Sequence, residues 1–127
     1  MLAYPPDQLW GTMFITAGKP VPLGHRPSID LSQYHSLSFD IHAEVDGQCV
    51  HLGIKDRTQP DDGSEITVQE CLTTQWSTVS LPLDAFANVD LTHLYVVLEV
   101  VFLGRSSETV ELRNIRYSPV TALPSPL

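Results

Sequence analysis

The chain has 127 residues, 43% of them hydrophobic, which predicts one globular domain with a single core. Its formal net charge is −8, and only seven residues are lysine or arginine. A basic phosphate-binding surface is therefore excluded, and neither nucleic acid nor an anionic membrane is expected as a partner. A neutral ligand or a cation suits this charge better. The N-terminal MLAYPPDQLWG lacks the basic and apolar segments of a signal peptide.

The first half of the chain predicts two strands separated by a loop. Residues 9–16 (LWGTMFIT) form the first strand, and the prolines and glycines of residues 17–27 indicate the loop. In residues 37–44, apolar and polar side chains alternate, as in a half-buried strand. Asp46-Gly47 then predicts a hairpin turn.

The stretch from Cys49 to Cys71 is the central feature of the sequence. Apolar residues recur at every second position in both of its arms: Val50, Leu52, Ile54, Ile66 and Val68. This period predicts two paired strands around a loop at residues 56–65. If paired residue numbers sum to 120, all these apolar residues lie on the buried side. Four polar residues then face outward, with His51 opposite Gln69 and Lys55 opposite Glu65.

The two cysteines are too few for a disulfide framework. In the register above, Cys49 lies directly opposite Cys71, which allows a cross-strand disulfide. Two neighbouring free thiols are the favoured interpretation, because cross-strand pairs often miss the torsion angle that a disulfide requires.

The remaining elements complete an all-β domain. Alternation at residues 79–83, the apolar run YVVLEVVF at 95–102 and the pattern at 110–115 predict three more strands. No helical period extends over 11 residues, and about seven strands predict an antiparallel β-sandwich, arranged as a jelly roll. The domain is expected to span residues 1–118, and the SPVTALPSPL segment makes 119–127 a linker or tail.

Five segments of the chain together resemble a known family. They are IDLSQYHSLSFDIHAE, VHLGIKDRTQPDDGSE, LTTQWSTVSLPLDAFANVDL, LYVVLEVVF and ETVELRNIRY. With these segments, Trp10 to Tyr117 resembles a carbohydrate-binding module of the galactose-binding-domain-like jelly-roll type, as appended to glycoside hydrolases. The resemblance implies a non-catalytic polysaccharide-binding domain with other domains of a parent chain as partners. It also implies an extracellular or cell-surface location within a larger protein.

The outward side of the central strands is the predicted binding site. Glu99 is the only charged residue in its apolar strand, and Tyr95 shares its face at a period of two. Polar side chains would bind sugar hydroxyls there, and an aromatic ring would stack on the sugar's C–H face. We therefore expect a shallow groove for a β-glucan-like chain, lined by His51, Lys55, Gln69, Tyr95, Glu99 and Trp10. A half-exposed strand held by one ion pair is the alternative.

No cofactor is predicted, with a bound calcium ion as the alternative. Four loop carboxylates could supply its oxygen ligands: Asp56, Asp61, Asp62 and Glu65. Sugar contact by this loop is a second interpretation, and a plain solvated turn is the favoured one. Relatives of the resembled type hold a structural calcium with an acidic residue just before the closing isoleucine. Here Arg113 and Asn114 stand before Ile115, which argues against that calcium.

Other candidates are interpreted as structural. Trp76 is expected in the core at the rim of the sandwich. His25 and Arg26, with Tyr34, could line a site at the loop end, but are interpreted as ordinary loop residues.

Catalytic patterns are missing from the sequence. None of the GxSxG, HExxH, GxGxxG and P-loop motifs occurs in it. A glycosidase needs two carboxylates across a deep cleft, which a small sandwich rarely offers. The sequence therefore predicts a binding domain and no enzyme. The alternative is a structural or protein-interaction module of a larger multidomain protein.

Overall fold

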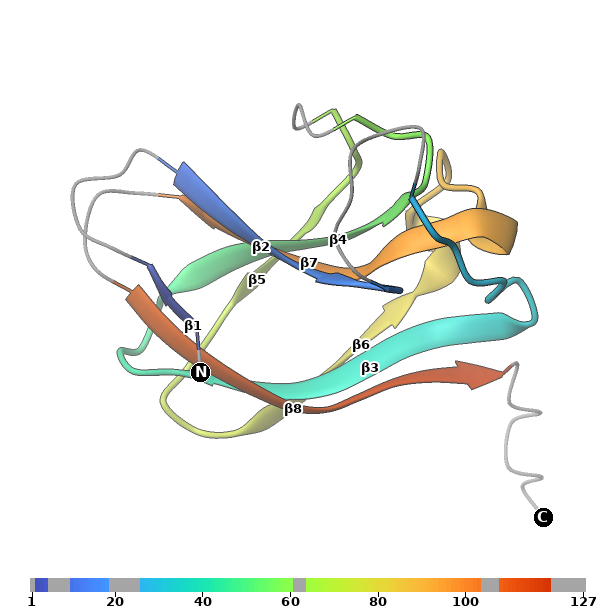
Figure 1. Cartoon of the computed structure of the whole chain (residues 1–127). Coiled ribbons are helices and arrows are strands. Elements are labelled where there is room, and N and C mark those ends of the chain that lie inside the picture. The colour runs from blue at the N-terminus through green and yellow to red at the C-terminus, as the bar shows by residue number, and fades with distance from the viewer. Residues whose placement is uncertain (1, 5–9, 19–25, 61–63, 104–107, 120–127) are drawn as a thin grey trace, which may run out of the picture.

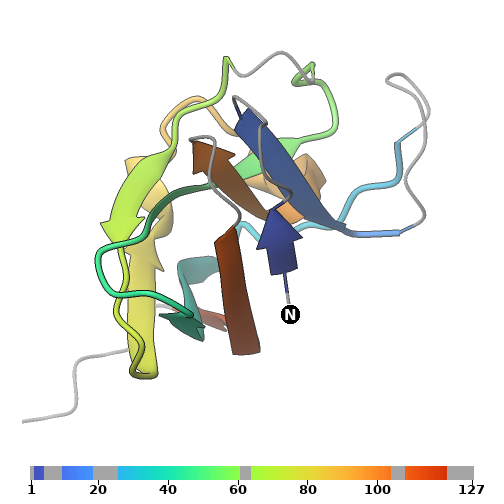
Figure 2. The ribbon, with the colours of Figure 1, turned by 90° about the vertical axis from the view of Figure 1, so that its left-hand side faces the viewer.

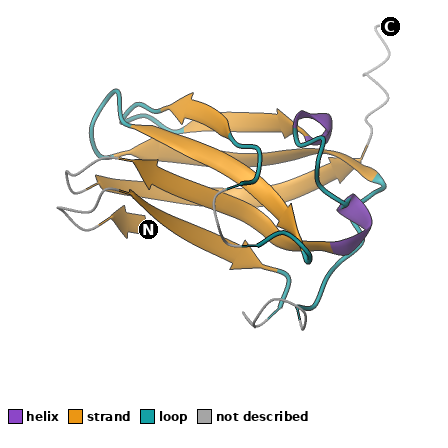
Figure 3. Cartoon of the chain, turned by 90° about the horizontal axis from the view of Figure 1, so that it is seen from above, coloured by secondary structure: helices purple, strands orange, loops and turns teal. Residues whose placement is uncertain are grey.

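The computed structural model describes residues 2–4, 10–18, 26–60, 64–103 and 108–119. Within these ranges the strands are β1 (Leu2–Tyr4), β2 (Trp10–Thr16), β3 (Tyr34–Ala43), β4 (Cys49–Asp56), β5 (Val68–Cys71), β6 (Ser77–Pro82), β7 (Leu94–Leu103) and β8 (Glu108–Pro119). Two short 3-10 helices, η1 (Leu83–Ala85) and η2 (Leu91–His93), lie at one end of the molecule (Figure 3).

The strands form two stacked layers (Figure 1). Sheet A has the strand order β1-β8-β3-β6, sheet B has the order β2-β7-β4-β5, and all pairings are antiparallel. Every connection between successive strands crosses from one sheet to the other, except the β4–β5 hairpin. The end view separates the two layers (Figure 2). The predicted antiparallel β-sandwich is confirmed, and the short strand β1 adds to the strands that the sequence predicted.

The core lies between the two sheets. Alternate residues of the three central strands fill it and are fully buried: Leu37, Phe39, Ile41, Val50, Leu52, Ile54, Leu98 and Val100. Burying one side chain of this size stabilises the fold by roughly 1.5–3 kcal/mol. The period of two in the sequence therefore identified the inner faces of β3, β4 and β7 correctly.

The predicted hairpin register is confirmed where β4 pairs with β5. Cys49–Leu52 pairs with Val68–Cys71, and the paired residue numbers sum to 120. The prediction that Ile66 is buried opposite Ile54 is wrong, because β5 begins only at Val68 and Ile66 is 40% exposed.

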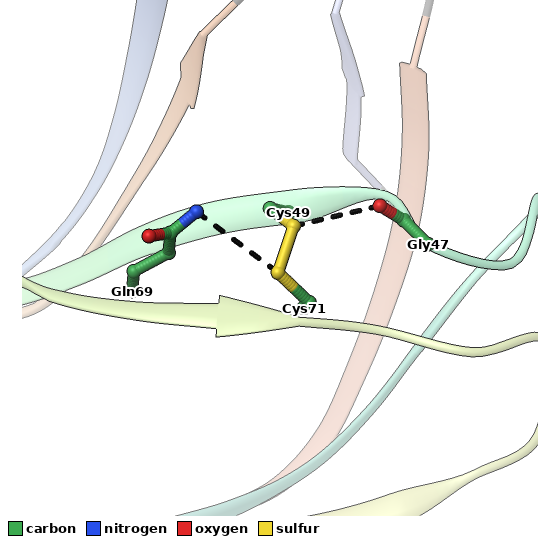
Figure 4. The surroundings of a disulfide bond; sticks show 4 residues. All are labelled: Gly47, Cys49, Gln69 and Cys71. Carbon is green, nitrogen blue, oxygen red and sulfur yellow. Dashed lines mark hydrogen bonds between the residues drawn. A yellow bond between two sulfur atoms is a disulfide. The ribbon is translucent and has the colours of Figure 1, made fainter.

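Cys49 and Cys71 form a disulfide, so the favoured prediction of free thiols is wrong (Figure 4). The neighbouring residues Gln48 and Leu72 carry a backbone hydrogen bond, with the Leu72 N–H donating to the Gln48 carbonyl at 2.7 Å. The cysteines therefore occupy the next, non-hydrogen-bonded position, where opposite Cα atoms come closest. Their Cα atoms are 3.9 Å apart.

Asp56 ends β4 and shapes the loop that follows. Its Oδ1 accepts hydrogen bonds from the Thr58 N–H (2.8 Å) and the Thr58 hydroxyl (2.6 Å), and its Oδ2 accepts one from the Asp90 N–H (2.9 Å). Burial opposes ionisation of this carboxyl group, but the hydrogen bonds from Thr58 and Asp90 outweigh it and lower the pKa of Asp56 below its ordinary value. The carboxylate thus joins the end of β4 to the segment before η2.

Loss of the disulfide is expected to destabilise the fold. A Cys49→Ser/Cys71→Ser double variant should have a free energy of unfolding about 3 kcal/mol lower, since the unfolded chain regains the entropy of the 22-residue loop. Urea unfolding measures the difference. Dithiothreitol should lower the stability of the wild type to that of the variant and leave the variant unchanged. Equal stability of the two oxidised proteins would contradict the expected contribution.

Replacement of Asp56 by alanine is expected to give a pH-dependent loss of stability. At pH 7 the loss should be about 2–3 kcal/mol, because two backbone N–H groups and one hydroxyl lose their acceptor. Since the folded-state pKa lies below the ordinary value of 3.8, the carboxylate's full contribution is present above pH 3.8 and disappears as the pH falls through the folded-state pKa.

Denaturant unfolding between pH 7 and pH 2 tests this dependence on Asp56. The gap between wild type and Asp56→Ala should narrow below pH 3.8, while the exposed control Asp84→Ala should be nearly neutral throughout. A gap of constant size down to pH 2 would contradict the assignment.

Candidate functional site

The predicted site residues from β4, β5 and β7 meet on sheet B. His51 pairs with Gln69 on one side and with Val101 on the other, and two residues along β4, Gly53 pairs with Glu99. Because alternate residues of β4 fill the core, these pairs belong to the outer face of the sheet. Figure 3 views the molecule from above this face.

One end of the outer face is accessible. His51 is half-buried, and its Nδ1 lies 3.3 Å from the Thr67 hydroxyl oxygen. Gln69 is exposed, and its amide lies beside the disulfide, with Nε2 3.9 Å from Cys71 Sγ (Figure 4). Val101 is half-buried next to His51. We call His51, Gln69 and Val101 the open end of the outer face.

Glu99 is buried in the middle of the outer face of sheet B. It was predicted to line an open groove, but it is only 2% exposed. The carboxylate sits above Gly53, where an added Cβ would come within 3.1 Å of Glu99 Oε2 and 3.3 Å of the Ile66 carbonyl oxygen. A side chain at position 53 would therefore be crowded by both groups, and they would have to shift to make room for it. Gly53 is the residue that lets Glu99 and the chain before β5 lie so close to the sheet.

Lys55 is also buried, which corrects the prediction that it faces solvent. It is 0% exposed, and its ammonium group donates a hydrogen bond of 2.8 Å to the Pro60 carbonyl. The same ammonium lies 5.0 Å from the centre of the Phe14 ring on β2. A cation over a ring face is attracted by the ring's quadrupole, and the attraction grows when water is excluded.

Tyr95 is covered in a similar way, so it offers no open stacking surface. It is buried, and the Arg26 guanidinium lies 4.7 Å from the centre of its ring. Arg26 also donates a hydrogen bond of 3.0 Å to the Gln59 carbonyl. Two irregularities in the β4–β7 pairing interrupt the alternation between Tyr95 and Glu99. The predicted period of two along β7 therefore does not hold at Tyr95.

Arg26 and Lys55 together hold one loop over one end of the face. They donate to the carbonyls of successive residues, Gln59 and Pro60, and each lies over an aromatic ring. The β4–β5 connection accordingly rises above sheet B (Figure 1). We call Lys55, Tyr95 and Arg26, with the loop above them, the closed end of the outer face.

Four residues that the sequence analysis singled out lie wholly or partly outside the described residues. The side chain of Trp10 is not described, although its backbone in β2 pairs with Leu103 of β7. Asp61 and Asp62 of the predicted calcium loop fall outside the described residues, as does His25.

The calcium prediction gains no support from Asp56, whose two oxygens already accept hydrogen bonds. Glu65 is buried, not solvated as a plain turn would place it. Among the described residues, no group of three histidine, cysteine or acidic side chains could hold a metal ion. Calcium binding by this loop stays a prediction.

Two further predicted placements can be compared with the structure. Trp76 is 39% exposed at the edge of sheet A, so its predicted place in the core is wrong. Tyr34 contacts the edge of the Tyr117 ring, with 6.2 Å between ring centres, and packs against the core. In the described ranges, no helix has the length and apolar character needed to cross a bilayer.

The sandwich resembles solved carbohydrate-binding modules. A family 30 module gives a TM-score of 0.65 at 21% identity, covering 91% of this chain but only 65% of that one. The family 30 module of a cellulosomal cellulase of Clostridium thermocellum gives 0.61 at 22% identity, covering 87% of this chain and 68% of the other. A family 11 module from Clostridium thermocellum, in complex with a β-1,3-1,4-mixed-linked tetrasaccharide, gives 0.59 at 14% identity, covering 87% and 89%. Identities at this level show likeness of fold.

A search of the curated proteins gave no match. The sequence itself matches the family described as Carbohydrate binding domain 30 over residues 6–119, which is nearly the whole chain. The chain therefore belongs to the carbohydrate binding domain 30 family, and it is a non-catalytic carbohydrate-binding module with a β-sandwich fold.

Proposed function

We propose that the open end of the sheet B face binds a β-glucan-like polysaccharide chain. The observation that carries the proposal is the row formed by Gln69, His51 and Val101 across three adjacent strands. This row combines an exposed amide, an accessible imidazole and an apolar side chain on one surface. Binding sites for small ligands use such a mixture of apolar contact and a few placed polar groups.

Each residue of the row has a distinct role in the proposal. The Gln69 amide and the His51 imidazole donate and accept hydrogen bonds with sugar hydroxyls. Val101 contacts the apolar C–H side of the sugar ring. Trp10 belongs to β2, the edge strand of sheet B opposite β5, and is proposed as the residue that stacks on the sugar. Affinity is expected to be weak, because sugar hydroxyls exchange water for protein partners at a small net gain.

The buried residues of the closed end act as supports. Lys55 and Arg26 hold the loop through Pro60 and Gln59, and Glu99 is buried above Gly53 in the middle of the face. They fix where the groove ends along the sheet and do not contact the sugar. This assignment replaces the direct sugar contacts predicted for Lys55, Tyr95 and Glu99.

A neutral glucan is favoured as the ligand. The net charge of −8 repels acidic polysaccharides, whereas an uncharged chain is unaffected. The similar family 11 module is described in complex with a mixed-linked β-1,3-1,4 tetrasaccharide. A mixed-linkage β-glucan is therefore the first polymer to test.

The module is proposed to work outside the cell as part of a larger protein. The Cys49–Cys71 disulfide suits an oxidising compartment. One similar module belongs to a cellulosomal cellulase. We infer that this chain holds a parent protein on polysaccharide, and that the other domains of that protein carry the chemistry.

Affinity electrophoresis through gels containing soluble mixed-linkage β-glucan tests the proposed site. A His51→Ala/Gln69→Ala double variant should bind about 10- to 30-fold more weakly, since it loses two hydrogen-bonding groups worth about 1 kcal/mol each. A matched control, His35→Ala/Gln33→Ala, removes the same two groups from exposed positions at the start of β3. It should migrate like the wild type.

Two results would count against the proposal. Equal retardation of the His51→Ala/Gln69→Ala variant and the wild type would remove the site from this face. If no soluble polysaccharide retarded the wild type, a structural or protein-interaction role would replace glycan binding. Thermal unfolding of each variant checks that its fold is intact.

A further inference from the structure

The outer face of sheet A carries an exposed aromatic residue that the proposed function does not use. Trp76 precedes β6 and is 39% exposed. The Arg113 guanidinium of β8 lies 4.0 Å from the centre of its ring. The His42 ring of β3 packs on it at 4.3 Å between ring centres, with an angle of 62° between the ring planes. Side chains from two strands therefore hold the Trp76 ring in place at the surface.

A hydrogen-bonded network fixes the polar groups beside Trp76. Asp40 accepts hydrogen bonds from Asn114 Nδ2 (2.8 Å), the Thr78 hydroxyl (2.8 Å) and Arg113 Nε (3.3 Å). The hydrogen bonds from Asn114 and Thr78 lower the pKa of Asp40 below its ordinary value, so it is a carboxylate at neutral pH. Arg113 is thus held against both Asp40 and Trp76, while 53% of its side chain stays exposed.

The backbone of β8 is distorted at this point. Asn114 has a positive φ of 57°, the only such non-glycine residue in the described chain. The β3–β8 pairing shifts between Ser38 and Asp40, which marks a β-bulge. A left-handed conformation is unfavourable for most residues with a side chain, and asparagine is one of the few that adopts it. Here the bulge brings the side chains of Asn114 and Arg113 to the same carboxylate.

The ionisable side chains that contact Trp76 have partners of opposite type. Arg113 faces Asp40, and His42 Nε2 lies 3.1 Å from Glu111 Oε1. Arg116, on the same strand, donates to the Asn114 carbonyl at 2.8 Å. The cation that contacts the Trp76 ring is thus neutralised by a carboxylate of the same network. The surface therefore favours an uncharged ligand rich in hydroxyl groups over an ion.

We propose that Trp76, Arg113, His42 and Thr78 form a second carbohydrate-binding site, on the opposite side of the sandwich from the first. It would take a neutral polysaccharide chain, with Trp76 against the C–H face of a sugar and with Arg113 and Thr78 hydrogen bonding its hydroxyls. His42, whose ring nitrogens lie within hydrogen-bonding distance of the Ala43 carbonyl and Glu111, holds the Trp76 ring in place. The choice of a neutral polysaccharide as the ligand of this second site rests on the proposed function. Two sites on opposite faces would let one module contact two polysaccharide chains, or two parts of one chain, and so raise its avidity.

The chain offers a direct test, because it contains only two tryptophans. In a ¹H–¹⁵N spectrum, the indole N–H signal of Trp76 reports on the sheet A face, and the other indole signal belongs to Trp10 of β2. A Trp76→Phe variant assigns the two signals. The probe is the mixed-linked β-1,3-1,4 tetrasaccharide, titrated into the wild type and into His51→Ala/Gln69→Ala.

The Trp76 signal should shift and saturate in both proteins, because the sheet B substitutions lie on the other face. In an Arg113→Ala variant, about tenfold more tetrasaccharide should be needed for the same shift, since one hydrogen-bonding group with a charge is lost. In gels with polymeric β-glucan, Trp76→Ala should be retarded less than the wild type. Dispersed backbone signals confirm that each variant is folded.

The outcomes separate the two proposals. If the Trp76 signal stays unmoved while the wild type is still retarded by β-glucan, the second site is wrong and the first stands. If the Trp76 signal shifts and His51→Ala/Gln69→Ala binds like the wild type, the second site stands and the first is wrong. If neither indole signal moves and no polysaccharide retards the wild type, both proposals fail.

Discussion

The packing of β3 against β4 and β7 is the interaction on which the rest of the structure depends. Alternate residues of these strands are fully buried between the sheets, so the residues between them must point away from the core. This constraint puts His51, Gly53 and Lys55 on one outer face. It puts Asp40 and His42 on the other. Both proposed carbohydrate sites are therefore consequences of how the apolar residues close the core.

Outward orientation does not by itself expose a side chain. Lys55 points away from the core and is nevertheless fully buried, because the loop that follows β4 lies above it. A buried cation is costly unless it has partners. The Pro60 carbonyl and the Phe14 ring supply such contacts for Lys55. The loop thus shortens the surface that a ligand can reach. The accessible part is the open end, beside the Cys49–Cys71 disulfide.

The sequence predicted what local periodicity determines. The strands, the inner faces and the Cys49–Cys71 register all follow from a period of two and from turn residues, and the structure agrees with them. Periodicity cannot report which outer residues the chain between β4 and β5 will cover, and this is why Lys55 and Glu99 were predicted to be exposed. Nor does it anticipate the pairing irregularities near Tyr95.

Two other errors have similarly non-local causes. A disulfide can form between Cys49 and Cys71 because they occupy a non-hydrogen-bonded pair of the two strands. The predicted register says which residues lie opposite each other, but not which of those pairs are hydrogen-bonded. Trp76 was assigned to the core because it begins a strand, at a position that usually packs at the rim of the sandwich. In the structure its ring rests on Arg113 and His42, two polar residues from strands 30 or more positions away in the sequence. Only the assembled sheet brings those side chains to it.

The disulfide has a mechanical consequence for a module that anchors a larger protein. β5 is the edge strand of sheet B, only four residues long, and it carries Gln69 of the open end. A short edge strand held by backbone hydrogen bonds alone would peel away readily under load. Since Cys71 is bonded covalently to Cys49, tension on β5 passes directly into β4 in the middle of the sheet. Shear on a polymer bound at the proposed site would therefore act on the inner strand β4 before it could strip off the strand that carries Gln69.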